Sequence, residues 1–195
     1  MKRRAALLLL CALCACGGTR EGGASHPVTG RGLAKTQPDR DPVRRIILAY
    51  PYTHETLNVV YFHDGHYDDA AMDKIESLMR DRHANVAGKI DVELIDYMVD
   101  IRKRLGLPPT ATFQILSGYR TPETNAHLAV SNGNVAKESL HKHGWAVDFR
   151  MEGVNGKAIC EIAKTMQRGG VAYYPKDNHV HVDLGNIRTW HENGS

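Results

Sequence analysis

The stretch Ser139-Leu-His-Lys-His-Gly-Trp-Ala-Val-Asp148 carries the strongest signal of how this chain folds. His141 and Asp148 are seven residues apart, too far for the i, i+4 pairing of two metal ligands on one helix. Gly144 and the alternating residues after it indicate a loop that runs into a strand. Asp148 then shares a strand face with the small Ala146, which leaves room above the carboxylate for His141 to fold back from the loop.

A second stretch, Asn178-His-Val-His-Val-Asp183, alternates more cleanly. From His179 on, its odd positions are His179, His181 and Asp183, and the even positions between and after them are Val180, Val182 and Leu184. This pattern predicts a half-buried strand with an apolar inner side and a polar outer side.

Together, the two stretches offer His141, Asp148 and His181 as three ligands of one metal ion. Two imidazoles and one carboxylate from separate elements suit an open zinc site with water in the fourth position. Zinc with one anionic ligand keeps a net positive charge, so it can acidify that water and polarise a carbonyl. A His-x-His pair on a strand is also common on a solvated surface, and spacing alone leaves both interpretations open.

Length and charge restrict the class of protein. The 195 residues suit one domain plus a tail, and 42% hydrophobic with 24% charged residues is typical of a globular protein. The net charge of +3 comes from Lys2, Arg3 and Arg4. Without residues 1–15, the 25 basic residues become 22 and balance the 22 acidic ones. A neutral mature chain argues against nucleic-acid binding.

The first residues read as an export signal. A basic start precedes an apolar run, Ala5 to Leu13, that is too short to span a bilayer. Leu13-Cys14-Ala15-Cys16 resembles a bacterial lipobox, which predicts a lipoprotein signal peptide at 1–15 and lipidation of Cys16. An ordinary cleaved secretory signal is the alternative. Cys160 then remains the single domain cysteine, expected in the core.

Residues 16–44 are rich in Gly, Ser, Thr and Pro and predict a flexible tether, followed by one domain at 45–195. Hydrophobic periodicity in that domain indicates both strands and helices. The expected strands are 45–51, 57–62, 112–116, 171–174 and 180–184, and the expected helices are 69–82, 91–105, one from 121 and 157–167. A polar loop at 129–139 is expected over the site.

Arg120 ends the run Ser117-Gly-Tyr-Arg120 after a strand, and Thr121-Pro122 then starts a helix. An arginine at a strand end beside a helix N-terminus is well placed to grip a carboxylate or a developing oxyanion. A surface ion pair is the alternative.

Three motifs resemble one family: Ser117-Gly-Tyr-Arg-Thr-Pro-Glu-Thr-Asn125, Ser139-x-His-x-x-Gly-x-Ala-x-Asp148 and, after Gln167-Arg-Gly-Gly170, Val180-His-x-Asp183. They are similar to murein endopeptidase K-like zinc peptidases of the D-Ala-D-Ala carboxypeptidase (M15, Hedgehog-like) superfamily. The resemblance covers about residues 45–190. It implies a Hedgehog-like α+β fold, with a central antiparallel sheet and flanking helices. It also implies zinc held by His141, Asp148 and His181.

The resemblance also implies the remaining site residues. His179 resembles a general base or a hydrogen-bond partner of the transition state, and Asp183 resembles a residue that orients a ligand imidazole or assists proton transfer. Arg120 resembles the arginine that stabilises the oxyanion or binds a substrate carboxylate, with Ser139 and Tyr119 as further substrate contacts. Asn178 stands where some relatives carry Glu, which raises the weight on His179.

The implied function is zinc-dependent hydrolysis of peptide cross-links in peptidoglycan by metal-activated water. The alternatives are a D-Ala-D-Ala carboxypeptidase that trims stem peptides, or a catalytically silent cell-wall-binding module. The expected partners are peptidoglycan stem peptides and cross-links. The protein is expected to be a monomer in the periplasm, attached to the outer membrane by its lipid alone, since Gly17 rather than Asp follows Cys16.

Overall fold

The computed structural model describes residues 41–131 and 135–191. The predicted signal peptide at 1–15, the lipidated Cys16 and nearly all of the tether at 16–44 lie outside these residues. Within the described ranges, none of the helices combines the length and apolar character needed to cross a membrane.

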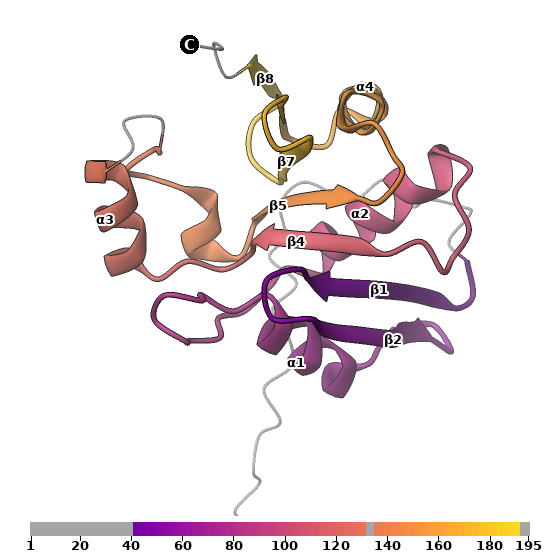
Figure 1. Cartoon of the computed structure of the whole chain (residues 1–195). Helices are drawn as coiled ribbons and strands as arrows, with labels where there is room; N and C mark the ends of the chain where they lie inside the picture. The colour runs from indigo at the N-terminus through magenta and orange to yellow at the C-terminus, as the bar shows by residue number, and fades with distance from the viewer. Residues whose placement is uncertain (1–40, 132–134, 192–195) are drawn as a thin grey trace, which may run out of the picture.

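One mixed sheet forms the centre of the molecule (Figure 1). In the described part of the chain it has eight strands in the order β3-β2-β1-β4-β5-β7-β6-β8. Their bounds are β1 Arg44–Tyr50, β2 Glu55–His63, β3 His66–Tyr67, β4 Phe113–Ser117, β5 Ala146–Met151, β6 Gly170–Tyr174, β7 His179–Asp183 and β8 Arg188–His191. Neighbouring strands are antiparallel except for the parallel pairs β1–β4 and β6–β8.

Three helices pack against the sheet: α1 (Asp69–Leu78) contacts β1 and β2, α2 (Val92–Arg104) contacts β1, and α4 (Gly156–Met166) contacts α2, β6 and β7. A fourth, α3 (Pro122–Ser131), lies beyond the end of β4 (Figure 1, left). A short 3-10 helix, η1 (Leu140–His143), precedes β5. The α+β fold class predicted from the sequence is confirmed.

Alternation along β5 and β7 separates the hydrophobic core from the polar face. Val147 and Phe149 of β5, with Val180 and Val182 of β7, are fully buried in the cluster that includes residues of α1, α2 and α4. Since successive residues of a strand point to opposite faces, the intervening polar side chains lie on the face away from these helices. The core therefore dictates which face carries Asp148.

Most predicted elements are confirmed, including the caps. Asp68 caps α1 by accepting from Ala71 N at 2.9 Å, and Asp91 caps α2 by accepting from Glu93 N at 2.9 Å. Gly106 follows α2 with φ of 68°, a backbone conformation that favours glycine. Cys160 is buried, as expected.

Several boundaries differ from the prediction, including the three described next. The first helix ends at Leu78 rather than at residue 82, because the Asp81 carboxylate accepts backbone N–H groups from the next turn. The helix α4 ends with Gln167 at φ 53°, before the two glycines expected to close it. The loop expected from residue 129 is shorter, because α3 continues to Ser131.

Candidate metal centre

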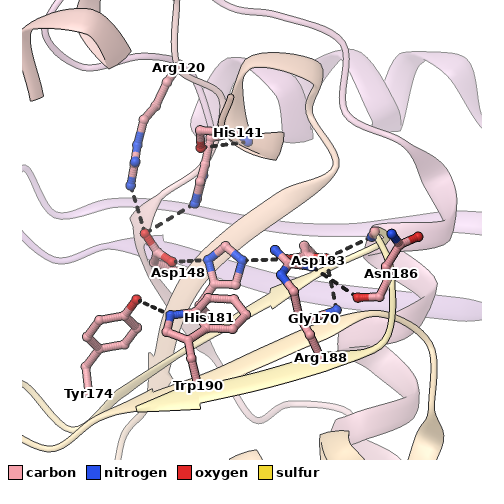
Figure 2. A network of polar contacts seen from close by, with 12 residues as sticks. Arg120, His141, Asp148, Gly170, Tyr174, His181, Asp183, Asn186, Arg188 and Trp190 are labelled. Atoms are coloured by element: carbon pink, nitrogen blue, oxygen red, sulfur yellow. Dashed lines mark hydrogen bonds and ion pairs between the residues drawn. The ribbon is translucent and has the colours of Figure 1, made fainter. Parts of the chain in front are cut away.

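Asp148 and His181 form the centre of the polar face. They are paired residues on the antiparallel strands β5 and β7, so their side chains lie next to each other on one face. Asp148 Oδ1 is 2.8 Å from His181 Nδ1, and Asp148 Oδ2 is 3.4 Å from His141 Nε2 (Figure 2). One ligand atom from each of the three residues lies within 4.8 Å of the others. The structure thus brings the three predicted ligands together.

His141 reaches this point from η1. Ser139 caps η1, and Gly144 ends it with φ of 65°. A Cβ at residue 144 would lie 1.8 Å from the backbone oxygen of Lys89, so this turn requires glycine. His141 Nδ1 is 2.7 Å from the carbonyl oxygen of Gly118, which suits donation from Nδ1 and leaves Nε2 directed towards Asp148.

His181 is held from its other side by Asp183. Asp183 Oδ2 lies 2.9 Å from His181 Nε2, which leaves Nδ1 turned towards Asp148. Asp183 has no exposed surface, and His181 is 8% exposed. The expectation of a polar outer side on this strand is therefore wrong at these two residues. The strand lies inside the sheet, and the chain that follows it covers the polar face.

The donor set fits a divalent metal ion such as zinc. Two imidazole nitrogens and one carboxylate oxygen converge, and each histidine has its second nitrogen occupied by a fixed oxygen acceptor. Acceptors of this kind hold the tautomer and the ring orientation of metal-binding histidines. Three protein ligands leave a coordination position free for water or substrate, as in catalytic zinc sites.

Charges around the centre favour a cation. Burial raises the pKa of Asp148, but His141 and His181 outweigh this and hold it well below its usual value. Burial lowers the pKa of His141, which keeps that imidazole neutral at pH 7. Burial also lowers the pKa of His181, but hydrogen bonds with Asp148 and Asp183 outweigh it and raise the value. A metal ion would supply the positive charge that these carboxylates favour.

Arg120 lies beside the same carboxylate. Its Nη2 is 2.9 Å from Asp148 Oδ2, and its Nε donates to Ser117 Oγ at 2.8 Å. The structure therefore shows Arg120 in an ion pair with a carboxylate of the metal centre itself, and its expected roles toward an oxyanion or a substrate carboxylate stay predictions. Its guanidinium borders the cavity above the three ligands.

A cavity of roughly 520 Å³ opens over the centre. The segment 135–140 lines it on one side, and Tyr174 and the 176–177 turn line it on another. His179 belongs to the wall, with its ring stacked on Tyr174 at 4.5 Å between centroids. The structure therefore places His179 beside the three ligands and outside their cluster.

The two residues predicted to contact substrate, Ser139 and Tyr119, lie in different cavities. Ser139 lines the cavity, and its hydroxyl accepts from His141 N at 3.4 Å. Tyr119 lines a neighbouring cavity of roughly 220 Å³ instead, with its ring so close to Gly88 that a Cβ there would lie 2.4 Å away. The structure does not bring Tyr119 to the cavity above the ligands.

Asn178, three residues before His181, is a turn residue. It has φ of 50°, its Oδ1 accepts from Gly156 N at 2.8 Å, and its Nδ2 donates to Val154 O at 3.1 Å. These bonds tie the β6–β7 turn to the start of α4.

Sequence reasoning missed four residues that surround the centre. Ser117 holds Arg120, and the Gly118 carbonyl holds His141, although both stand in a motif that had been recognised. Arg188 and Trp190 lie beside Asp183 and His181. Arg188 stands five residues after Asp183, and the spacing of two residues between Arg188 and Trp190 puts both on one strand face, so a usable signal was present.

Comparison with known proteins identifies the family of the chain. A family model described as "Peptidoglycan L,D-endopeptidase MepK" matches residues 39–190. Escherichia coli strain K12 has a peptidoglycan L,D-endopeptidase MepK that is 35% identical over 179 residues, 91% of this chain and 94% of that protein. A probable peptidoglycan L,D-endopeptidase MepK of Haemophilus influenzae is 39% identical over 124 residues, 64% of this chain and 66% of that protein. No solved structure matches the chain.

Proposed function

Because the chain belongs to the peptidoglycan L,D-endopeptidase MepK family of M15 peptidases, we propose that it is a murein endopeptidase that hydrolyses peptide cross-links with the help of zinc. The observation that carries this proposal is the convergence of His141, Asp148 and His181 at the base of a cavity. The relatives' names point to L,D peptide bonds as the substrate class.

When bound, zinc supplies a Lewis acid that polarises the scissile carbonyl and lowers the pKa of a water molecule. His141 and His181 present the nitrogens that hold it, because Gly118 O and Asp183 engage their other ring nitrogens. Arg120, beside Asp148 at the cavity wall, stabilises the negative charge that develops on the carbonyl oxygen.

His179 is the proposed proton carrier. Its ring lies in the cavity wall against Tyr174, and a histidine can act as acid or base near neutral pH. The side chain of Asn178 is engaged in the β6–β7 turn, so this position offers no carboxylate base. His179 therefore takes the proton from water and delivers it to the leaving amine.

The family supports an endopeptidase over a carboxypeptidase, because the matching family model and the curated relatives are described as endopeptidases. A carboxypeptidase would release a single terminal residue, and a silent wall-binding module would release nothing.

The experiment is digestion of isolated sacculi and of purified cross-linked muropeptides with the purified protein, with and without a chelator, followed by mass analysis. We expect monomers from dimers, loss of activity with chelator and recovery with zinc, and one equivalent of zinc by metal analysis. Loss of a single terminal residue would indicate a carboxypeptidase. Full zinc occupancy without any product would overturn the enzymatic assignment.

We also propose that the protein works in the periplasm, lipidated at Cys16 and attached to the outer membrane. The basic start, the short apolar run and the lipobox-like Leu13-Cys14-Ala15-Cys16 support this location. Such an anchor and tether would hold the domain against its substrate. Labelling with a fatty-acid probe should depend on Cys16, and Cys16→Ser should abolish the label and release the protein from the membrane fraction.

A further inference from the structure

We propose that Arg188 is a positioning residue of the metal centre: it fixes the Asp183 carboxylate and, through Asp183, holds the His181 ring with Nδ1 turned towards Asp148. This inference rests on the proposed function in one respect, that the three clustered residues bind a metal ion. Arg188 does not itself belong to the group of three.

The contacts form a continuous chain from Arg188 to the ligands (Figure 2). Arg188 Nη2 donates to Asp183 Oδ2 at 2.7 Å, and Nη1 donates to Asp183 Oδ1 at 3.1 Å. Asp183 Oδ2 in turn lies 2.9 Å from His181 Nε2. A two-pronged arginine–carboxylate pair fixes the plane of the carboxylate as well as its position. Asp183 Oδ2, which contacts Arg188, therefore also contacts the His181 imidazole from a defined direction.

Asp183 needs such a partner because it is fully buried. Its Oδ1 also accepts backbone N–H groups from Gly170 at 2.9 Å and from Gly185 at 2.8 Å. These amides are neutral, and a buried carboxylate without a countercharge is strongly unfavourable. Arg188 is the cationic side chain that the described residues bring to Asp183.

The local backbone is shaped to admit this pair. The parallel pairing of β6 with β8 puts Gly170 opposite Arg188. A Cβ on Gly170 would lie 2.4 Å from Arg188 Nη1 and 2.5 Å from Asp183 Oδ2. A side chain at residue 170 would therefore displace the ion pair. The close approach of the Arg188–Asp183 pair, rather than a turn, therefore explains why residue 170 is glycine.

Trp190 completes the wall on the same side. It stands two residues after Arg188 on β8, so both side chains share a face. The Arg188 guanidinium lies 4.8 Å from the Trp190 ring centre, and the Trp190 ring lies 5.1 Å from the His181 ring. Trp190 Nε1 donates to Tyr174 Oη at 3.2 Å. The strand β8 thus holds His181 through Asp183 and through direct ring contact.

Without Arg188, Asp183 would retain its two amides and would lose its countercharge. Water could then reach the carboxylate, since the Arg188 side chain is 46% exposed and separates Asp183 from solvent. The His181 ring would keep Asp183 as its acceptor, but the two-pronged contact that fixes the direction of that carboxylate would be lost. Changes to residues that hold metal ligands typically weaken metal binding by about 10- to 100-fold.

The test is zinc affinity, measured by competition with a chromophoric chelator, for wild type, Arg188→Ala, Arg188→Lys and the control Thr189→Ala. Thr189 is the exposed neighbour on β8. We expect about 10-fold weaker zinc binding for Arg188→Ala. The zinc affinity of Arg188→Lys should lie between those of the wild type and Arg188→Ala, because lysine restores the charge without the two-pronged contact. Thr189→Ala should bind zinc as the wild type does.

A second readout reports on geometry. In the zinc-loaded wild type, nitrogen NMR of His181 should show the metal at Nδ1 and an Nε2–H proton that is protected from exchange with solvent. In Arg188→Ala, the Nε2–H proton should exchange with solvent faster. Circular dichroism of each variant checks folding. Unchanged zinc affinity and an unchanged Nε2–H in a folded Arg188→Ala protein would overturn the proposal.

These measurements separate this inference from the proposed function. If wild type binds zinc and leaves muropeptides intact, the endopeptidase assignment fails, and the role of Arg188 still stands or falls on the affinity series. If muropeptides are cleaved and Arg188→Ala keeps wild-type affinity, only the positioning role fails. If wild type binds no zinc, both fail.

Discussion

Asp148 and His181 face each other across the β5–β7 pair, with Asp148 Oδ1 2.8 Å from His181 Nδ1. Register alone creates this contact, because a shift of one residue would turn either side chain into the core. The buried valines on the opposite face of β7 keep the register in place. The hydrophobic core and the metal centre are therefore two consequences of one pairing.

Replacing Asp148 with asparagine should remove zinc binding. The variant keeps the shape of the side chain and loses its charge, so His181, His141 and Arg120 lose their common anionic partner. We expect zinc affinity to fall by more than about 10-fold and muropeptide cleavage to become undetectable. Chelator competition and product analysis measure the two effects. Wild-type affinity in Asp148→Asn would contradict the ligand assignment.

Arg120→Ala should reduce turnover with zinc still bound. The guanidinium borders the cavity and is not one of the three ligands, so its loss removes a stabilising charge from the reaction rather than from the metal. A decrease in kcat of about 10²- to 10³-fold is expected. The matched control is Arg150→Ala, since Arg150 lies on the same strand as Asp148 and donates to Gln114. If Arg120→Ala loses zinc as well as activity, the role of Arg120 is to hold Asp148 in place rather than to stabilise the charge that develops in the reaction.

His179→Ala should lower kcat by about 10²- to 10⁴-fold if His179 carries the proton. Zinc content should not change, because His179 lies outside the group of three. The pH dependence of kcat should lose one limb in the variant. His143→Ala, which alters an exposed histidine next to Trp145, is the control and should be fully active. A fully active His179→Ala protein would move the proton-transfer role elsewhere.

Asp81 should contribute to stability in a pH-dependent way. Its carboxylate accepts from Thr121 N at 2.8 Å and from Thr121 Oγ1 at 2.9 Å, which holds the start of α3 next to Arg120. Burial raises the pKa of Asp81, but hydrogen bonds from Thr124, Thr121 and Ala84 outweigh it and lower the value from 3.8 to about 2. The charged form is thus favoured in the folded protein.

The contribution of Asp81 is fully present above pH 3.8, its unfolded value, and is lost as the pH falls towards 2. Asp81→Asn should cost about 1–3 kcal/mol of unfolding free energy at pH 7. Urea denaturation at several pH values tests this. The difference between wild type and variant should shrink as the pH falls through this window, and a constant difference would exclude an ionised Asp81 as the cause.

Local patterns in the sequence were sufficient for most of the elements, whereas the ligand set came from the family resemblance, because spacing alone left a solvated surface pair as an alternative. Caps such as Asp91 and the alternation around His181 act within a few residues, and the structure follows them. The helix end at Leu78 was missed because Asp81 stops it through a turn that periodicity does not reveal. Tyr119 was predicted to contact substrate because it stands in the Ser117–Asn125 motif. Its ring instead packs on Gly88, outside the cavity over the ligands.

The sequence by itself determined which residue types are available and which face of each strand they occupy, since both depend on spacing along the chain. Only the tertiary structure decided which nitrogen of His141 is left for a metal, because the Gly118 carbonyl that engages the other nitrogen is 23 residues away in the sequence. His181, in contrast, meets Asp183 on its own strand. The parallel β6–β8 pairing likewise brought Arg188 to Asp183 and buried a strand face expected to be exposed. Contacts of this kind depend on strand order and register, which local periodicity does not specify.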